Sequence, residues 1–421
     1  MSSFDAIILT MPPLLDPQNS TTTPDLLPRK IFGLNRNIFI LGLTSFFNDF
    51  SNEMILAAFP AFFTSVLKAG AASLGLVEGI ADGMSNIIKI YSGQLSDKVK
   101  RRRIFIFLGY GLSVAIRPFY MVMGSVAGVL GLRVVDRIGK GVREAPRDVI
   151  ISVSSKPEEM GRSFGYHRAM DTAGGILGPL TAYLILSRWP GGFNTIFMTA
   201  FLIGLIAFAT IFFVKDVVIA RDGQGVRIFS LKTFLSFSLR FKWYLVAIFI
   251  FSIGSLPSAL LLLQTTNIGL TIASIPLYYM VYSISFTLFS YAAGKLSDKI
   301  GTSRVLAFGY AILALSYLAL ITSSTSLTLG ISFAVMGLFS ACTDSTQRAF
   351  VAKTTPEYER GTAYGMYNAI VGFGVMISGI IGGYLWQAFG SMSALFAAEA
   401  VVIVGLVVFY ASTKVGRGEV R

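Results

Sequence analysis

The sequence predicts an all-α integral membrane protein of twelve transmembrane helices in two pseudo-symmetric six-helix bundles. Of its 421 residues, 54% are hydrophobic and 14% are charged, whereas soluble domains average about 25% charged residues. Apolar runs of roughly 20 residues recur along the chain, and each can cross the hydrocarbon layer of a bilayer. There is also a repeat, because Gly93–Lys98 (GQLSDK) returns in the second half as Gly294–Lys299 (GKLSDK). Two similar halves are typical of membrane carriers whose site lies between them.

The apolar segments are long and continuous, which favours helices over the short alternating strands of a membrane barrel. The predicted spans of the first half are 37–64, 72–97, 104–126, 128–152, 164–187 and 192–214. Those of the second half are 243–266, 272–296, 304–323, 327–352, 361–387 and 390–412.

The net charge of +13 would suggest a nucleic-acid partner for a soluble protein. Most Lys and Arg residues, however, fall on one side of the predicted spans, and the predicted outer loops hold only Lys68 and Arg188. Because basic residues stay on the cytoplasmic side, both termini are predicted to be cytoplasmic, with the protein in the cell membrane. The basic excess then reflects topology and attraction to anionic lipid head groups. We expect the lipid bilayer, and no nucleic acid, as a partner.

The predicted domain boundaries follow the spans. A charged stretch in the middle of the chain indicates a cytoplasmic connector, and the other connections are too short for a soluble catalytic domain. One cysteine and one histidine give few ways to build an active site or a metal cage, so we expect no enzyme, no cofactor and no metal site. The domains are a cytoplasmic tail (1–36), a first bundle (37–214), the connector (215–242), a second bundle (243–413) and a cytoplasmic tail (414–421).

The repeated turn carries a first resemblance to a known family. In its first copy it continues into a basic stretch, so that residues 93–103 read GQLSDKVKRRR. This string resembles the cytoplasmic loop between helices two and three of the major facilitator superfamily. The resemblance implies that the glycine permits tight helix packing, the aspartate caps a neighbouring helix, and the arginines tether the loop in an inner gate. A basic loop that only fixes topology is the alternative. The positions concerned are Gly93, Asp97, Arg101, Arg102, Gly294 and Asp298.

A second resemblance lies in predicted helix five. Gly165, Gly174, Gly178 and Pro179 follow the spacing of the superfamily's antiporter motif, although its closing pair of glycines is replaced. The motif implies proton-coupled export. Small residues in such a row also let helices approach closely, and proline bends a helix, so a packing seam is the alternative interpretation.

Predicted helix four is unusually charged for a membrane span. Arg133, Asp136, Arg137 and Lys140 lie within it, and charges inside hydrocarbon must face water or one another. Arg133 resembles the arginine of the superfamily's helix-four motif, which is linked to proton coupling. Asp136 and Arg137 stand where that motif has glutamine and glycine. We therefore predict Arg133 and Asp136 as proton-coupling residues, and Arg137 and Lys140 as substrate ligands.

Predicted helix one supplies acids, because Asn48, Asp49, Asn52 and Glu53 cluster in its middle. A buried carboxylate resists ionisation and a nearby arginine favours it, so acids that face arginines can act as a proton switch. We predict that Asp49 and Glu53 lie near the depth of the helix-four arginines and take part in proton coupling. A permanently paired polar cluster that only holds helices together is the alternative.

Further polar residues in the predicted spans are candidate substrate ligands. Glu78 is expected to reach only the outer surface, and His167 is expected to be an ordinary polar lining residue. Arg168 and Asp171 could also pair with helix-four charges. The candidate ligands are Asn48, Asn52, Asp82, Arg137, Lys140, Arg168, Asp171, Gln264, Asn267 and Tyr282.

From about residue 35 to 413, the chain resembles a major facilitator superfamily transporter. The resemblance implies secondary active transport of a small molecule by alternating access, with protons as the coupling ion. The antiporter-like row favours export, and the membrane charges and aromatic residues favour an organic anion or an amphipathic drug-like compound as substrate. Proton-coupled import of an anionic metabolite and export of a divalent metal are the alternatives. We expect a monomer.

Overall fold

The structure is a computed structural model that describes residues 30–99, 101–155, 159–216, 237–355 and 360–415. Two short antiparallel strands, β1 (Lys30–Ile31) and β2 (Leu34–Asn35), precede the helices. The long helices of the first half begin and end close to the predicted spans. They are α2 (Arg36–Ser65), α3 (Ala71–Val99), α4 (Arg102–Ile116), which is extended by the 3₁₀ turn η1 (Arg117–Met121), α5 (Val126–Val153), α6 (Met160–Arg188) and α7 (Phe193–Ile211).

The second half repeats this arrangement. Its long helices are α9 (Leu239–Gly254), α12 (Ile275–Ile300), α13 (Thr302–Thr322), α14 (Ser326–Thr354), α15 (Arg360–Phe389) and α16 (Ser391–Val415). The short helices α10 (Ser258–Leu262) and α11 (Gln264–Asn267) and the 3₁₀ turn η3 (Ile272–Ser274) join α9 to α12.

The predicted span 243–266 is therefore not one continuous helix. The chain leaves the helical conformation at Ser255, which has φ −91° and ψ 91°, and Pro257 then precedes α10. Proline lacks an N–H group and disfavours the helical conformation of the residue before it. The sequence Ser255-Leu256-Pro257 thus ends α9 and precedes the start of a new, short helix.

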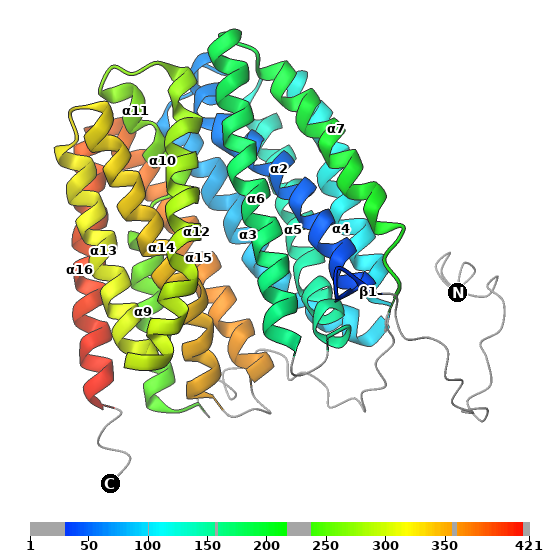
Figure 1. Cartoon of the computed structure of the whole chain (residues 1–421). Coiled ribbons are helices and arrows are strands. Elements are labelled where there is room, and N and C mark those ends of the chain that lie inside the picture. The colour runs from blue at the N-terminus through cyan, green and yellow to red at the C-terminus, as the bar shows by residue number, and fades with distance from the viewer. Residues whose placement is uncertain (1–29, 100, 156–158, 217–236, 356–359, 416–421) are drawn as a thin grey trace, which may run out of the picture.

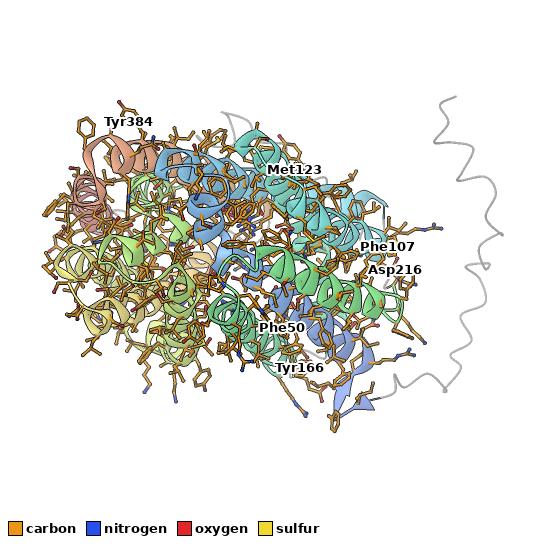
Figure 2. The ribbon with its side chains drawn as sticks, turned by 90° about the horizontal axis from the view of Figure 1, so that it is seen from above. Phe50, Phe107, Met123, Tyr166, Asp216 and Tyr384 are labelled. Carbon is orange, nitrogen blue, oxygen red and sulfur yellow. The ribbon has the colours of Figure 1, made fainter. Side chains whose placement is uncertain are left out.

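The helices stand side by side and alternate in direction (Figure 1). The strand β1 and the C-terminal end of α16 lie at one end of the bundle, which we call the basal end. The short helices α10 and α11 lie at the opposite end, which we call the apical end. Seen from above, the helices of the first half and those of the second half form two neighbouring groups (Figure 2).

Charge is distributed unevenly among the long helices. Among the described residues, nine helical segments are long and apolar enough to cross a membrane. The long helices α2, α3 and α5 do not meet that standard, and they are the helices that carry most of the predicted site residues. Polar membrane helices of this kind are stable when their charged faces point into the protein. We therefore expect the polar faces of α2, α3 and α5 to point into the protein.

The two halves meet most extensively where α3 packs along α15. Glycines line this contact on both helices. A Cβ atom at Gly83 would lie 2.8 Å from the carbonyl oxygen of Gly372, and one at Gly383 would lie 2.7 Å from that of Ala71. The backbones thus approach more closely than any larger residue would allow. We call this contact the α3–α15 glycine seam. Additional contacts between the halves join α6 to α12 and α2 to α12.

Candidate functional site

A buried ion pair joins α3 to α5 on the apical side of the first half. The Nε and Nη2 atoms of Arg133 donate to the two carboxylate oxygens of Glu78 at 2.7 and 2.9 Å, and both side chains are at most 2% exposed. The expectation that Glu78 reaches only the outer surface is wrong. Both helices begin at the apical end, and each residue lies about two turns into its helix, so the two side chains share one depth.

Further charges extend this pair into a network. Asp136 lies 3.5 Å from Arg133, and Asp82 lies 2.9 Å from Arg137. Arg137 also reaches to 4.0 Å from Glu78. The Asp82 side chain is 39% exposed, whereas the other four side chains are buried. We call these five residues the α3–α5 charge network. It holds two cations and three anions, so each arginine has acidic partners.

The acids of α2 have a different environment. Asn48 donates to Asp49 and Asn52 donates to Glu53, each at 3.0 Å. The hydroxyl group of Tyr279, on α12 in the other half, donates to the second carboxylate oxygen of Glu53 at 2.7 Å. In the described part of the chain, neither carboxylate forms an ion pair. Both acids are therefore held by neutral hydrogen-bond donors, and Glu53 bridges the two halves.

Within the described residues, the nearest cations of α5 pair with other acids, since Arg137 lies 2.9 Å from Asp82 and Lys140 lies 3.9 Å from Glu144. The predicted proton-coupling residues fall into two groups. Arg133 and Asp136 belong to the α3–α5 charge network, whereas Asp49 and Glu53 remain outside it.

Arg117 is a buried arginine that the sequence analysis did not single out. Its Nη1 donates to Ser51 at 2.5 Å, and its Nη2 donates to Asn48 at 3.3 Å. It also contacts the carbonyl oxygen of Ala200 on α7. Arg117 therefore anchors the Asn48 side, next to Asp49, to α4 and α7. Its signal in the sequence was a single arginine near the end of an otherwise apolar run.

Lys140 belongs to a second, more basal cluster between α3 and α5. Glu144 lies 2.8 Å from Lys89 and 3.9 Å from Lys140. The Lys140 side chain remains 36% exposed. Lys89 and Glu144 have only about one fifth of their side-chain surface exposed.

The ionisable residues of α6 separate into two pairs. His167 lies 3.4 Å from Asp171 on the same helix, and both are largely buried. Arg168 lies 3.3 Å from Asp344 on α14 and 4.8 Å above the ring of Phe286 on α12. Among the described ion pairs, neither Arg168 nor Asp171 pairs with a charged residue of α5. The Arg168–Asp344 pair instead joins the two halves, and both side chains are about half exposed.

The structure separates the candidate ligands of the second half. Tyr282 lies in a row of rings along α12, with ring centroids 5.6 Å from Tyr279 and 6.4 Å from Phe286. Its hydroxyl group donates to Ser340 at 2.9 Å. Gln264 and Asn267 form a hydrogen bond with each other on α11, at the apical end and away from the acids of α2.

The two copies of the repeated turn differ in what can be described. Gly93 and Asp97 lie in α3, but their surroundings fall outside the described part of the structure. Arg101 is exposed and Arg102 is buried. In the second copy, Asp298 lies 3.7 Å from Lys353 at the end of α14. A Cβ atom at Gly294 would meet nothing within 4 Å, so the tight packing implied for this glycine is absent here.

The antiporter-like row of α6 packs against the acid-bearing stretch of α2. A Cβ atom at Gly174 would overlap the carbonyl oxygen of Phe46, and one at Gly178 would lie 2.7 Å from that of Phe50. Pro179 follows within the same helix. A Cβ atom at Gly165 would have open space around it. Two of the three glycines therefore hold α6 close to the segment that carries Asp49 and Glu53.

This contact leads to a prediction with an internal control. Gly174→Ala should destabilise the protein by about 1–3 kcal/mol, because the new methyl group must displace backbone of α2. Gly175→Ala should be neutral or slightly stabilising, because its Cβ atom would meet nothing within 4 Å and alanine favours helix. Thermal unfolding in detergent measures both variants. Equal melting temperatures would contradict a close-packed seam.

Comparison with known proteins identifies the family. The Major Facilitator Superfamily model matches residues 41–262 and 243–419. An uncharacterized MFS-type transporter from Methanocaldococcus jannaschii is 33% identical over 383 residues, which cover 90% of this chain and 95% of that protein.

More distant relatives carry functional names. A multi-drug resistance efflux pump PmrA homolog from Lactococcus lactis is 23% identical over 90% of this chain and 95% of its own length. A proton-coupled antiporter flippase LtaA from Staphylococcus saprophyticus is 22% identical over 90% of this chain and 94% of its own length. The crystal structure of the nucleoside transporter NupG superposes with a TM-score of 0.73 at 16% identity, covering 90% of this chain and 99% of that one, which shows the shared fold. The chain belongs to the Major Facilitator Superfamily and is a multi-pass membrane transporter, not an enzyme.

Proposed function

We propose that this transporter exports an amphipathic drug-like compound or an organic anion in exchange for protons, by alternating access of a site between its halves. The observation that carries the proposal is the hydrogen bond from Tyr279 to Glu53. An ionised carboxylate accepts such a bond more strongly than a protonated one. Proton binding at Glu53 would therefore weaken a contact between the halves, and this links protonation to their movement.

The environment of the acids supports Glu53 and Asp49 over Asp136 as proton sites. Asp136 lies 3.5 Å from Arg133, in a network that also contains Arg137. Asp49 and Glu53 accept hydrogen bonds from asparagine and tyrosine side chains. These donors are uncharged, so they stabilise a negative carboxylate less than an arginine does. We assign proton coupling to the α2 acids, and a structural and orienting role to the α3–α5 charge network.

The names of the distant relatives support the direction of transport. One relative is named as an efflux pump and another as a proton-coupled antiporter, and both align along most of this chain. The glycine row of α6, which resembles the antiporter motif, packs against the acids of α2. Together these observations favour export with inward proton flow. The basal end would then be cytoplasmic, in agreement with the distribution of basic residues, and we expect a monomer in the cell membrane.

The walls between the halves offer two kinds of ligand contact. The ring row of Tyr279, Tyr282 and Phe286 suits a molecule with a flat apolar body. Lys140 and Arg168 have partly exposed side chains that suit a carboxylate or phosphate group. Among the described residues, no group of three or more His, Cys, Asp or Glu side chains is placed to hold a metal ion. The metal-export alternative thus receives no support from the described side chains.

Flux in proteoliposomes tests the proposal. Tetraphenylphosphonium and p-aminohippurate serve as an amphipathic cation and an aromatic anion, with the membrane potential clamped by valinomycin and potassium. An acidic lumen should drive one of these probes inward, because protons leave as the probe enters. Reversing the gradient should reverse the direction of flux. Accumulation that requires the opposite gradient would indicate symport, and flux equal to that of protein-free liposomes for both probes would contradict the proposal.

A further inference from the structure

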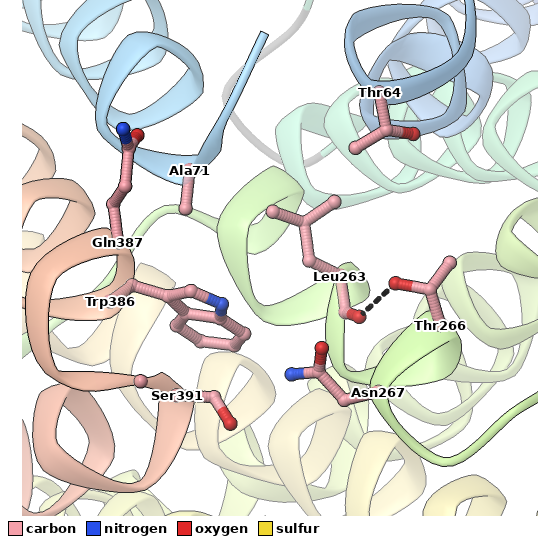
Figure 3. A pocket seen from close by; sticks show the side chains of 9 residues that line it. Thr64, Ala71, Leu263, Thr266, Asn267, Trp386, Gln387 and Ser391 are labelled. Atoms are coloured by element: carbon pink, nitrogen blue, oxygen red, sulfur yellow. Dashed lines mark hydrogen bonds between the residues drawn. The ribbon is translucent and has the colours of Figure 1, made fainter. Parts of the chain in front are cut away.

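A pocket of about 550 Å³ lies at the apical end, between the two halves (Figure 3). The first half contributes Thr64 and Ala71, and the second half contributes residues of α11 and of the corner between α15 and α16. The volume of the pocket is typical of small-molecule sites. Thr64 lies about 16 Å beyond Glu53 along α2, at 1.5 Å per residue. Because of this distance, the pocket is distinct from the charged centre described above.

The lining residues carry no formal charge. One wall is the indole ring of Trp386, which is 7% exposed, and Leu263 and Ala71 add apolar surface (Figure 3). A charged ligand would find no counter-ion among the lining residues. A flat, neutral molecule would instead bury apolar surface against the indole and leucine side chains.

Several polar groups keep unused hydrogen-bonding capacity that can face such a molecule. The amide nitrogen of Asn267 donates to Gln264 at 2.9 Å, which leaves its carbonyl oxygen available. The carbonyl oxygen of Gln387 accepts from the backbone N–H of Ala72 at 3.0 Å, which leaves its amide nitrogen available. Within the described residues, the indole N–H of Trp386 and the hydroxyl group of Ser391 donate to no protein acceptor. Donors and an acceptor thus lie beside the apolar side chains of Trp386, Leu263 and Ala71 in the pocket wall.

We propose that this apical pocket binds a neutral, ring-bearing amide or alcohol and that binding holds the two halves closed at the apical end. The walls belong to both halves, so separation of the apical ends would pull them apart. A ligand that binds only one conformation shifts the population towards it. The pocket is then an inhibitory site. This regulatory consequence rests on the alternating access proposed above, whereas ligand binding does not.

Equilibrium dialysis with isotope-labelled indole-3-acetamide tests binding to the full-length protein in lipid nanodiscs. We expect saturable binding beyond that of empty nanodiscs. Trp386→Leu should weaken it about tenfold or more, because the ring wall is lost. Phe389→Leu is the matched control, because Phe389 is an aromatic residue at the same end of α15 that is 64% exposed and does not line the pocket. Its affinity should be unchanged. Ser391→Trp, which fills the pocket from its rim, should also abolish binding and covers the case in which Trp386→Leu fails to fold.

Distance measurements test the conformational part. Spin labels at Lys68→Cys and Ser324→Cys, in a Cys342→Ala background, report the separation of the apical loops of the two halves. Indole-3-acetamide should narrow the distribution towards short distances and inhibit transport, and Trp386→Leu should remove both effects. Binding no greater than in empty nanodiscs, or equal binding by the Trp386→Leu variant, would overturn the inference even where transport is measured. Binding with closure but without transport of any probe would instead count against the proposed function and leave the site standing.

Discussion

Glu53→Gln should abolish proton-driven accumulation of the transported probe while exchange of the probe without a gradient continues. Glutamine keeps the size of the side chain and its hydrogen bond with Tyr279, but it cannot gain or lose a proton. Coupling free energies between two ligands typically correspond to changes of about 5–150-fold, so we expect accumulation to fall by at least about tenfold. The pH dependence of transport should become flat. Proteoliposome flux at several pH gradients measures each of these effects.

Two matched variants separate proton binding from the contact between the halves. Tyr279→Phe keeps the acid and removes only the hydrogen bond, so it should weaken coupling without abolishing it. Asp136→Asn alters an acid of the α3–α5 charge network and should leave the pH dependence unchanged in whatever transport activity remains. If Glu53→Gln retains the wild-type response to the pH gradient, Glu53 is not the coupling site. The same test applied to Asp49→Asn decides whether the two acids act together.

Glu78→Ala should be the most destabilising single substitution in the charge network. Arg133 is 1% exposed and loses both of its short bonds to Glu78, which leaves a buried cation underpaired. Removing one partner of a buried ion pair typically costs about 3–5 kcal/mol. We expect a fall in melting temperature in detergent of several degrees or more. Asp82→Ala is the control on the same helix, and its effect should be smaller because Asp82 is 39% exposed.

The double variant Glu78→Met with Arg133→Met sharpens this test. Replacing both members of a buried ion pair by apolar residues is often far less costly than removing one. The double variant should therefore be more stable than Glu78→Ala, although Asp136 loses a neighbour at 3.5 Å. A double variant less stable than Glu78→Ala would show that the ion pair contributes more to stability than the removal of its two charges from water costs. Circular dichroism and fluorescence unfolding curves provide the comparison.

The membrane architecture could be predicted from the sequence because the relevant signals are local. Apolar runs and the distribution of basic residues predicted helices such as α2 (Arg36–Ser65) and α16 (Ser391–Val415) closely. Hydropathy does not predict the break at Ser255–Pro257, because it stays high through this segment while the backbone leaves the helical conformation. Proline within α2 and α6 does not break those helices, so a proline in an apolar segment does not by itself predict the end of a helix.

The pairing within the site was harder to predict, because depth in the membrane does not reveal which helices are neighbours. The sequence placed the α2 acids opposite the α5 arginines, but α3 packs against α5 and supplies Glu78 and Asp82 instead. The role of Tyr279 could not be predicted, because a tyrosine in an apolar segment usually only packs against its neighbours. Only the arrangement of the two halves shows that its hydroxyl group reaches Glu53.

The glycine seam between α3 and α15 has a mechanical consequence. Side chains that interlock across an interface must disengage before the interface can turn, and this raises the barrier to rotation. At Gly75 and Gly379 the nearest atoms across the seam belong to the backbone of the other helix, so side chains do not interlock at these positions. The seam should therefore offer little resistance when one half rotates against the other. The resistance to pivoting then falls on the few specific polar contacts elsewhere between the halves, where a bound proton or solute can release it.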